Sequence, residues 1–297
     1  MTPDRQTAPR PHSPTVEIGL VAMAVIWGVN FSVVKYGTQV MAPLAYNVLR
    51  MGLGCVVLLV MASLRAGPKP AWRDRLSLMG LGVLGHCIYQ VFFISGLART
   101  RAGTASLVIS ATPAVVAIVA RITGHERLPR RAVLGILLSI SGVLLVLGGS
   151  LSADGTNSLI GDLMILCAVV CWGFYTTGLV PFTRRVEPVQ VAAWTLCGGV
   201  VPLALIASPA LWHTAWSAVT WLTWGAVAYS GLLAMVIAYL FWYRGVHELG
   251  PTRTAMYANL QPIVAVLVAW LVLHEVPTVT QGLGAATVIG GLYLSRS

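Results

Sequence analysis

Long apolar runs follow one another along almost the whole chain and are separated only by short polar breaks. Each run holds about 18 to 22 residues, the length that an α-helix needs to cross the hydrocarbon core of a bilayer. Backbone polar groups in lipid must be satisfied within their own segment, so the runs predict transmembrane helices. We expect ten of them, over residues 16–36, 43–63, 76–97, 102–121, 130–148, 159–180, 189–207, 219–243, 252–273 and 279–295.

The composition agrees with a polytopic helical membrane protein. Hydrophobic residues make up 57% of the chain and charged residues only 9%, whereas about a quarter of the residues of a soluble domain are charged. Residues 1–15 are polar and are expected to form an N-terminal tail. No small-residue cleavage site follows the first apolar run, so we expect no removable signal peptide.

The basic residues indicate the orientation of the chain in the membrane. With the N-terminus in the cytoplasm, 15 of the 19 Lys and Arg residues fall on the cytoplasmic side, and Arg50 lies inside a span. Only Lys35, Arg99 and Arg101 fall on the opposite side. Basic residues concentrate on the cytoplasmic side of membrane proteins, so we predict that both termini are cytoplasmic and that the number of spans is even. Anionic lipid head groups account for the net charge of +10, and no nucleic-acid partner is expected.

An internal repeat divides the spans into two halves, residues 16–150 and 151–297. A shift of 149 residues places Gly96 on Gly245, Pro113 on Pro262 and His125-Glu126 on His274-Glu275. A shift of 145 residues places Trp27-Gly28 on Trp172-Gly173 and Glu17 on Asp162. Each half holds five spans, an odd number, so the second half enters the membrane with the opposite orientation. This inverted-topology repeat predicts a substrate site between the halves, around a central cavity.

Several segments resemble one known family. They are Trp27-Gly28-Val29-Asn30-Phe31 ending in Lys35; Leu49-Arg50; His125-Glu126-Arg127-Leu128 running to Gly135 and Gly142; and His274-Glu275-Val276-Pro277 running to Gly282, Gly284 and Gly291. They resemble the drug/metabolite transporter superfamily, and within it the ten-span exporters with two EamA-type repeats. The chain is most similar to the bacterial aromatic amino-acid and paraquat exporter branch. Small multidrug relatives carry a carboxylate about two turns before the first-helix lysine, where this chain has Trp27.

The resemblance implies an exporter of small metabolites in the bacterial inner membrane, working by alternating access. It further implies a small-molecule substrate, the lipid bilayer as surroundings, no cofactor and activity as a monomer. Two alternatives remain at this point. A channel or facilitator for small polar solutes would normally show rings of like charge or a filter-like loop, and the sequence has neither. An intramembrane enzyme would need clustered aspartates or a nucleophile beside a base, and these are also missing from the sequence.

Ionisable residues inside the spans are rare and therefore informative, because each costs roughly 2.5–3.5 kcal/mol to insert. The acidic residues of the spans, Glu17, Glu126, Asp162 and Glu275, fall near predicted span ends. We interpret Glu126 and Glu275 as helix-end anchors. Arg50 lies about two turns into its span, where its side chain can reach the interface; a gating or carboxylate-binding role is the alternative.

One helical face carries His86 together with Tyr89, Gln90 and Phe93, at spacings of i, i+3, i+4 and i+7. We interpret His86 as a hydrogen-bonded packing residue or a substrate ligand, and as the remaining proton-coupling candidate. The cysteines Cys167 and Cys171 lie one turn apart without a further ligand, so no metal site is expected.

Polar and aromatic residues of several spans are predicted to line the central cavity. The predicted substrate-binding residues are Trp27, Asn30, His86, Tyr89, Gln90, Ser110, Trp172, Tyr175, Tyr239, Trp242, Tyr257, Asn259 and Gln261. Pro113 and Pro262 each remove a helical hydrogen bond and are predicted hinges. Amides that donate and accept, beside flat aromatic rings, suit a small and mostly apolar amino acid, with an aromatic one preferred.

Overall fold

The computed structural model describes residues 14–66, 69–124 and 130–296, and every regular element within these ranges is helical. The first half comprises α1 (Pro14–Val40), α2 (Pro43–Leu64), α3 (Trp72–Gly82), η1 (Val83–Ile88), α4 (Tyr89–Arg99), α5 (Ala102–Ile109), α6 (Thr112–Ile122) and α7 (Arg130–Asp154). The second half comprises α8 (Thr156–Thr183), α9 (Pro188–Trp212), η2 (Trp216–Ala218), α10 (Trp221–Ala228), η3 (Tyr229–Ile237), α11 (Ala238–Leu249), α12 (Pro251–Tyr257), α13 (Leu260–Leu273) and α14 (Val279–Arg296). Each of the ten predicted spans corresponds to helix.

Length and hydropathy identify the molecule as a polytopic membrane protein. Within the described ranges, eight helical stretches are long and apolar enough to cross a bilayer, and α7 adds the shorter apolar stretch Val133–Gly149. This confirms the predicted fold class. The His125-Glu126 motif lies outside the described residues, as does nearly all of the predicted tail. The division of the chain at residue 150 stays a prediction.

Proline and glycine fix several helix ends. Pro43, Pro188 and Pro251 begin α2, α9 and α12, where the missing N–H of proline would have no helical partner anyway. Gly250 ends α11 with a φ of 83°, a left-handed conformation that side chains disfavour. The chain therefore turns tightly from α11 into α12.

The two halves are related by a two-fold axis, as α7 and α14 show. A Cβ atom added to Gly142 would meet the carbonyl oxygen of Gly284, and one added to Gly291 would meet that of Gly135. The 149-residue shift places Gly135 on Gly284 and Gly142 on Gly291. Exchanging the two halves therefore turns the contact between Gly142 and Gly284 into the contact between Gly291 and Gly135. The order of these contacts also makes α7 and α14 antiparallel. An axis that relates antiparallel membrane-spanning helices lies in the membrane plane, so the repeat is inverted.

The third span of each half contains a π-helical segment. In the first half it is η1, between α3 and α4, and in the second it is η3, between α10 and α11. The 149-residue shift places the end of η1, Ile88, on the end of η3, Ile237. Because a π-helix closes its hydrogen bonds over five residues instead of four, each segment rotates the side chains on one side of it relative to the other.

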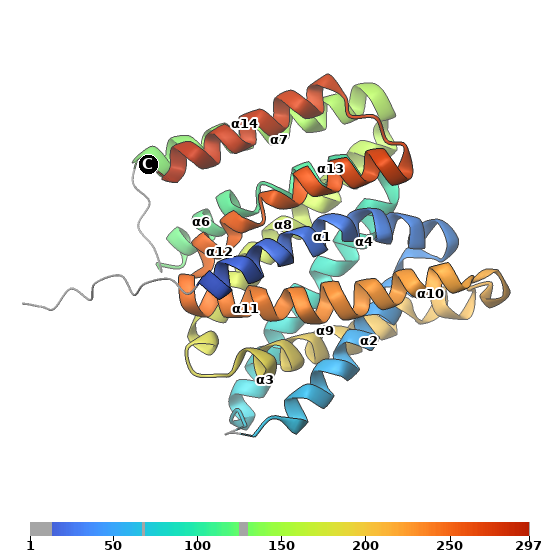
Figure 1. Cartoon of the computed structure of the whole chain (residues 1–297), viewed down its shortest axis with the longest axis vertical. Coiled ribbons are helices and arrows are strands. Elements are labelled where there is room, and N and C mark those ends of the chain that lie inside the picture. Colours follow the sequence, from blue (N-terminus) through green and yellow to red (C-terminus); the bar gives the residue numbers. More distant parts are fainter. Residues whose placement is uncertain (1–13, 67–68, 125–129, 297) are drawn as a thin grey trace, which may run out of the picture.

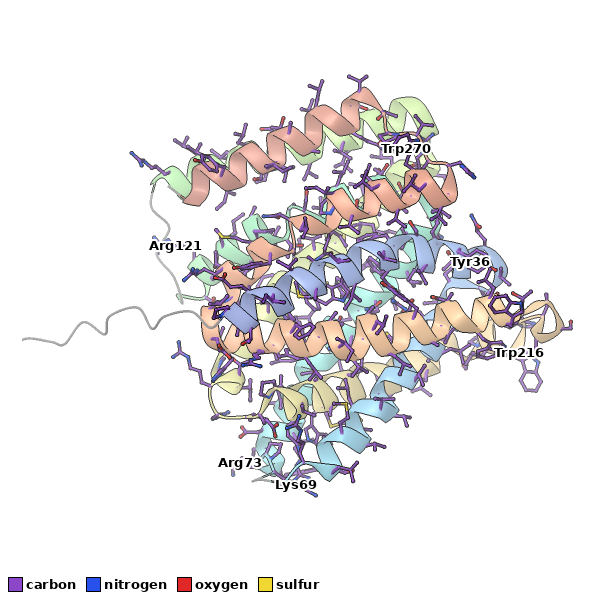
Figure 2. The ribbon with its side chains drawn as sticks, in the orientation of Figure 1. Tyr36, Lys69, Arg73, Arg121, Trp216 and Trp270 are labelled. Atoms are coloured by element: carbon purple, nitrogen blue, oxygen red, sulfur yellow. The ribbon has the colours of Figure 1, made fainter. Side chains whose placement is uncertain are left out.

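The helices run between two ends of the molecule, and α7 and α14 pack together along one edge (Figure 1). The start of α1 and the end of α14 lie at the same end. Lys69, Arg73 and Arg121 lie toward this end, which we call the basic end, whereas Tyr36, Trp216 and Trp270 lie toward the other (Figure 2). This arrangement is typical of a membrane protein with basic residues on one side and interfacial aromatic residues.

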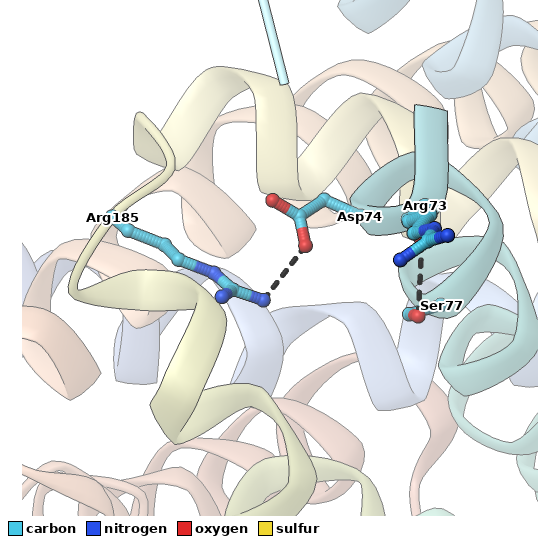
Figure 3. Close-up of polar contacts among 4 residues, drawn as sticks. All are labelled: Arg73, Asp74, Ser77 and Arg185. Atoms are coloured by element: carbon cyan, nitrogen blue, oxygen red, sulfur yellow. Dashed lines mark hydrogen bonds and ion pairs between the residues drawn. The ribbon is translucent and has the colours of Figure 1, made fainter. Parts of the chain in front are cut away.

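Exposed ion pairs join the two halves at the basic end. Arg185, which follows α8, contacts the Asp74 carboxylate of α3 at 2.7 Å, and the Ser77 hydroxyl donates to the Arg73 carbonyl nearby (Figure 3). Arg65 and Glu187 form a second pair at 3.7 Å. Exposed pairs of this kind contribute about 0–1 kcal/mol each, so they hold the halves together only weakly at this end.

Candidate functional site

A cavity lies between the two halves and takes its walls from both. The space between its walls, which includes open solvent at its mouth, is about 580 Å³. It is lined by Trp27, Asn30, Phe31, Arg50, Tyr89, Gln90, Phe93, Ile109, Thr112, Val169, Trp172, Met235, Tyr239, Trp242, Ala258 and Gln261. Eight of these are residues that the sequence analysis placed there: Trp27, Asn30, Tyr89, Gln90, Trp172, Tyr239, Trp242 and Gln261.

Seven of the sixteen residues that line the cavity are aromatic. Trp27 and Trp172, which occupy equivalent positions in the repeat, have ring centroids 6.1 Å apart and nearly perpendicular planes. Tyr239 lies 5.4 Å from Trp27 and Trp242 lies 5.3 Å from Trp172. Such pairs add about 0.5–1.5 kcal/mol each beyond burial, so the rings hold one another in place and present a preformed apolar surface.

Arg50 is the charged group of the cavity lining. Its side chain is 0% exposed, which corrects the interpretation that it reaches the membrane interface: the residue lies near the helix start, but on the face of α2 that points inward. Its Nε donates to Asn47 Oδ1 and its Nη2 donates to Gln90 Oε1, both at 2.8 Å. Its guanidinium carbon lies 5.9 Å from the centre of the Phe93 ring. These contacts fix the guanidinium against the cavity wall.

The amide of Asn30 belongs to a second polar group. Its Oδ1 accepts a hydrogen bond of 2.6 Å from the Ser230 hydroxyl, which is 2.9 Å from the Tyr46 hydroxyl. The Trp27 indole N–H donates to the Ala234 carbonyl at 3.0 Å. These bonds all cross from the first half to the second, so they tie α1 and α2 to η3 beside the cavity.

His86 lies outside the cavity lining, although it shares a helical spacing with Tyr89 and Gln90. It falls within η1, and the π-helical register turns it away from the face that α4 presents. Its Nε2 is 2.9 Å from the Tyr175 hydroxyl and 3.2 Å from the Tyr243 hydroxyl. Tyr175, also a predicted ligand, is likewise outside the lining. Both residues belong to a buried hydrogen-bonded cluster, and their role in binding stays a prediction.

The remaining predicted substrate-binding residues lie near the two helix interruptions that precede Pro113 and Pro262. The carbonyl freed by Pro113 accepts from the Thr112 hydroxyl at 2.6 Å, and the one freed by Pro262 accepts from the Gln261 N–H at 3.0 Å. Thr112 and Gln261 thereby face the central cavity. Three further predicted residues, Ser110, Asn259 and Pro262, line a smaller cavity beside α14. Tyr257 packs against hydrophobic core residues. The hinge role of both prolines stays a prediction.

Charged residues near the end opposite the basic end anchor helices. Glu275 accepts from the backbone N–H groups of Ala102 and Gly103, both at 3.2 Å, at the start of α5, which confirms its interpretation as a helix-end anchor. The Lys35 ammonium donates to carbonyls at the end of α4, including that of Thr100 at 2.6 Å. Asp162 of α8 is fully buried, deeper than its position near the start of that helix suggested.

In the described part of the chain, no three His, Cys, Asp or Glu side chains gather as a metal site.

Comparison with known proteins gives a consistent match. Residues 15–148 and 159–297 each match the model of the EamA-like transporter family. The uncharacterized transporter YyaM of Bacillus subtilis is 29% identical over 93% of this chain and 92% of its own length. A probable terminal-alkyne amino-acid exporter of Streptantibioticus cattleyicolor is 30% identical over 93% of this chain and 91% of its own length. One crystal structure of a protein shares the fold, with a TM-score of 0.70 at 20% identity, covering 95% of this chain and 96% of that one.

Proposed function

The chain belongs to the EamA-like transporter family and is a membrane transporter, and from this premise we propose that it exports small amino acids or related metabolites. Aromatic amino acids are the preferred substrates. The observation that carries the proposal is the central cavity, where aromatic rings adjoin the amides of Asn30, Gln90 and Gln261. The rings suit an apolar side chain, and the amides suit the two polar ends of an amino acid. The similarity to a probable amino-acid exporter supports the same substrate class.

The mechanism that we propose is alternating access. Walls from two halves related by an axis in the membrane plane enclose one cavity, and rocking one half against the other exposes such a cavity to each side in turn. The weak ion pairs at the basic end, such as Arg185 with Asp74, can break at little cost during this motion. The cavity is complete within one chain, which supports transport by a monomer.

We further propose that the protein lies in the bacterial inner membrane with the basic end in the cytoplasm. Lys69, Arg73 and Arg121 lie toward the end where α1 begins, and cytoplasmic loops carry an excess of such residues. Both termini are then cytoplasmic. A reporter joined after Ser297 that is active only in the periplasm would contradict this orientation.

Counterflow in proteoliposomes tests the substrate class. Vesicles containing the purified chain and loaded with an unlabelled amino acid are diluted into a trace of labelled phenylalanine, tryptophan, methionine or threonine. We expect saturable accumulation that is strongest for the aromatic amino acids. Accumulation that never saturates would indicate a channel, and no accumulation of any amino acid would refute the proposal.

A further inference from the structure

We propose that Arg50 binds the carboxylate of the transported substrate and that the side chains of Asn47 and Gln90 position it to do so. This inference rests on the proposed function, because it assigns one end of an amino-acid substrate to one wall of the central cavity. It makes Arg50, for which the sequence analysis kept a carboxylate-binding role as the alternative, the residue that selects for an anionic group.

The first observation is an unused donor on a buried cation. Nε and Nη2 of Arg50 are engaged with Asn47 and Gln90, whereas Nη1 is buried and has no hydrogen-bond partner among the described residues. No acidic side chain stands in the cavity lining, and the ion pairs found in the described chain do not include Arg50. A buried charge is costly unless an opposite charge and hydrogen bonds compensate for it. The site therefore lacks an anion, and a substrate carboxylate supplies one.

A second unsatisfied donor in the cavity lining points to the same ligand. Trp242 lines the cavity, and its buried indole N–H has no acceptor among the described residues. A carboxylate accepts several hydrogen bonds at once, whereas a neutral or cationic ligand group does not compensate for Arg50. Two unsatisfied donors on residues that line one cavity thus favour an acceptor with negative charge.

The second half has no arginine at the position equivalent to Arg50. A Cβ atom on Gly231 would meet the backbone oxygen of Arg50, and one on Gly82 would meet that of Thr195. The repeat shifts place Gly82 on Gly231 and Arg50 on Thr195, so the position equivalent to the arginine carries a neutral hydroxyl. One cation suits one carboxylate, whereas a phosphate ester or a dianion would call for several Lys or Arg residues.

The neighbours of the guanidinium define the orientation of the ligand. Gln90 and Phe93 of α4 lie beside Arg50, and the Phe93 ring stacks on Tyr89 at a centroid distance of 5.7 Å with planes 9° apart. A ligand that places its carboxylate on Arg50 therefore extends its side chain along these rings. The substrate class is an amino acid or related monocarboxylate with a flat apolar side chain.

Three related ligands separate the carboxylate from the amino group: phenylalanine, 3-phenylpropionate, which lacks the amine, and phenethylamine, which lacks the carboxylate. Each is used to compete with labelled phenylalanine for binding to the purified full-length protein. We expect phenethylamine to compete about tenfold to hundredfold more weakly than the two carboxylates, as the loss of a charge-assisted hydrogen bond implies. Equal competition by phenethylamine and phenylalanine in the wild-type protein would overturn the proposal without any variant.

Variants of Arg50 test whether this residue causes the preference for carboxylate ligands. Arg50→Gln is expected to weaken both carboxylate ligands to the level of phenethylamine while leaving phenethylamine itself unchanged, and Arg50→Lys to restore part of the difference. Arg99→Gln removes the same charge from an exposed residue of α4 and is expected to change nothing. Unchanged affinity for phenylalanine in Arg50→Gln, with amino-acid counterflow intact, would overturn the role of Arg50 and leave the export function standing. Failure of all three ligands to bind, together with absent counterflow, would overturn both.

Discussion

Gly96 marks the crossing of α4 and α8, and its replacement by alanine is predicted to force these helices apart. A Cβ atom at Gly96 would lie 2.7 Å from the carbonyl oxygen of Gly161 and 3.0 Å from the Ile165 side chain. The crossing is reciprocal, because a Cβ atom at Gly161 would lie 2.8 Å from the carbonyl oxygen of Gly96. Small residues allow membrane helices to approach this closely.

The size of the effect follows from these distances. Ordinary van der Waals contact begins at 3.4 Å, so the added carbon must move from 2.7 Å to about that value against a helix backbone, which cannot rotate away as a side chain does. Overpacking of this kind costs about 1–3 kcal/mol. At the repeat-equivalent Gly245, the new carbon would meet mainly the side chains of Leu20 and Thr254, at 2.8 Å or more. We therefore expect Gly245→Ala to cost less than Gly96→Ala.

Thermal unfolding of the purified protein in detergent measures the difference. Gly80→Ala is the control, because Gly80 lies in the same continuous helix and a Cβ atom there would meet nothing within 4 Å. We expect Gly96→Ala to lower the Tm by several degrees and Gly80→Ala to leave it unchanged or slightly raised, since alanine favours helix. Equal Tm values for the two variants would show that α4 and α8 do not cross at Gly96.

Three further predictions concern the cavity, the buried cluster and the basic end. Trp27→Ala is expected to reduce aromatic amino-acid counterflow at least tenfold, because it removes a ring from the aromatic wall. Trp221→Ala, at an exposed site, is the control and should leave counterflow unchanged. Equal flux in the two variants would show that the aromatic wall serves packing and does not bind the substrate. His86→Gln is expected to remove the response of transport to an imposed pH gradient while substrate affinity persists, and an unchanged response would contradict a proton-coupling role. Asp74→Asn is expected to lower the unfolding free energy by no more than about 1 kcal/mol, less in high salt, because its pair with Arg185 is exposed; denaturation at two salt concentrations measures it.

The sequence predicts the spans and the repeat well because both follow from the hydrophobic pattern and from small residues. Gly142 and Gly284 illustrate the reason: each permits close contact between α7 and α14, so each appears in the sequence as a repeated glycine. The π-helical segments η1 and η3 leave no comparable signal. Their wider hydrogen-bond spacing is a tertiary adjustment, so regular helical spacing grouped His86 with Tyr89 and Gln90, although His86 is outside the cavity lining.

The cavity was predicted only in part, for a related reason. Trp27 and Trp172 could be recognised because they recur in mid-span, where interfacial aromatic residues are not expected. Arg50 could not be recognised as a cavity residue, because the position of a residue along a helix gives its distance from the membrane surface but not the direction in which its side chain points. The hydrogen bond to Gln90 that holds it there depends on the packing of α2 against α4, which no local pattern reveals.

The buried guanidinium also gives the transporter an electrical property. Arg50 lies in a cavity between membrane-spanning helices, so its charge lies within the electric field across the membrane. Moving one elementary charge through the whole field is worth about 2.3 kcal/mol per 100 mV. Under the alternating access that we propose, the empty carrier therefore reorients at a rate that depends on voltage, in proportion to the part of the field that the guanidinium crosses. A bound monocarboxylate without an amine cancels this dependence, whereas a zwitterionic amino acid, whose ammonium group moves with it, leaves it in place. An interior-negative potential favours the state with Arg50 nearer the cytoplasm, the side on which an exporter must load its substrate.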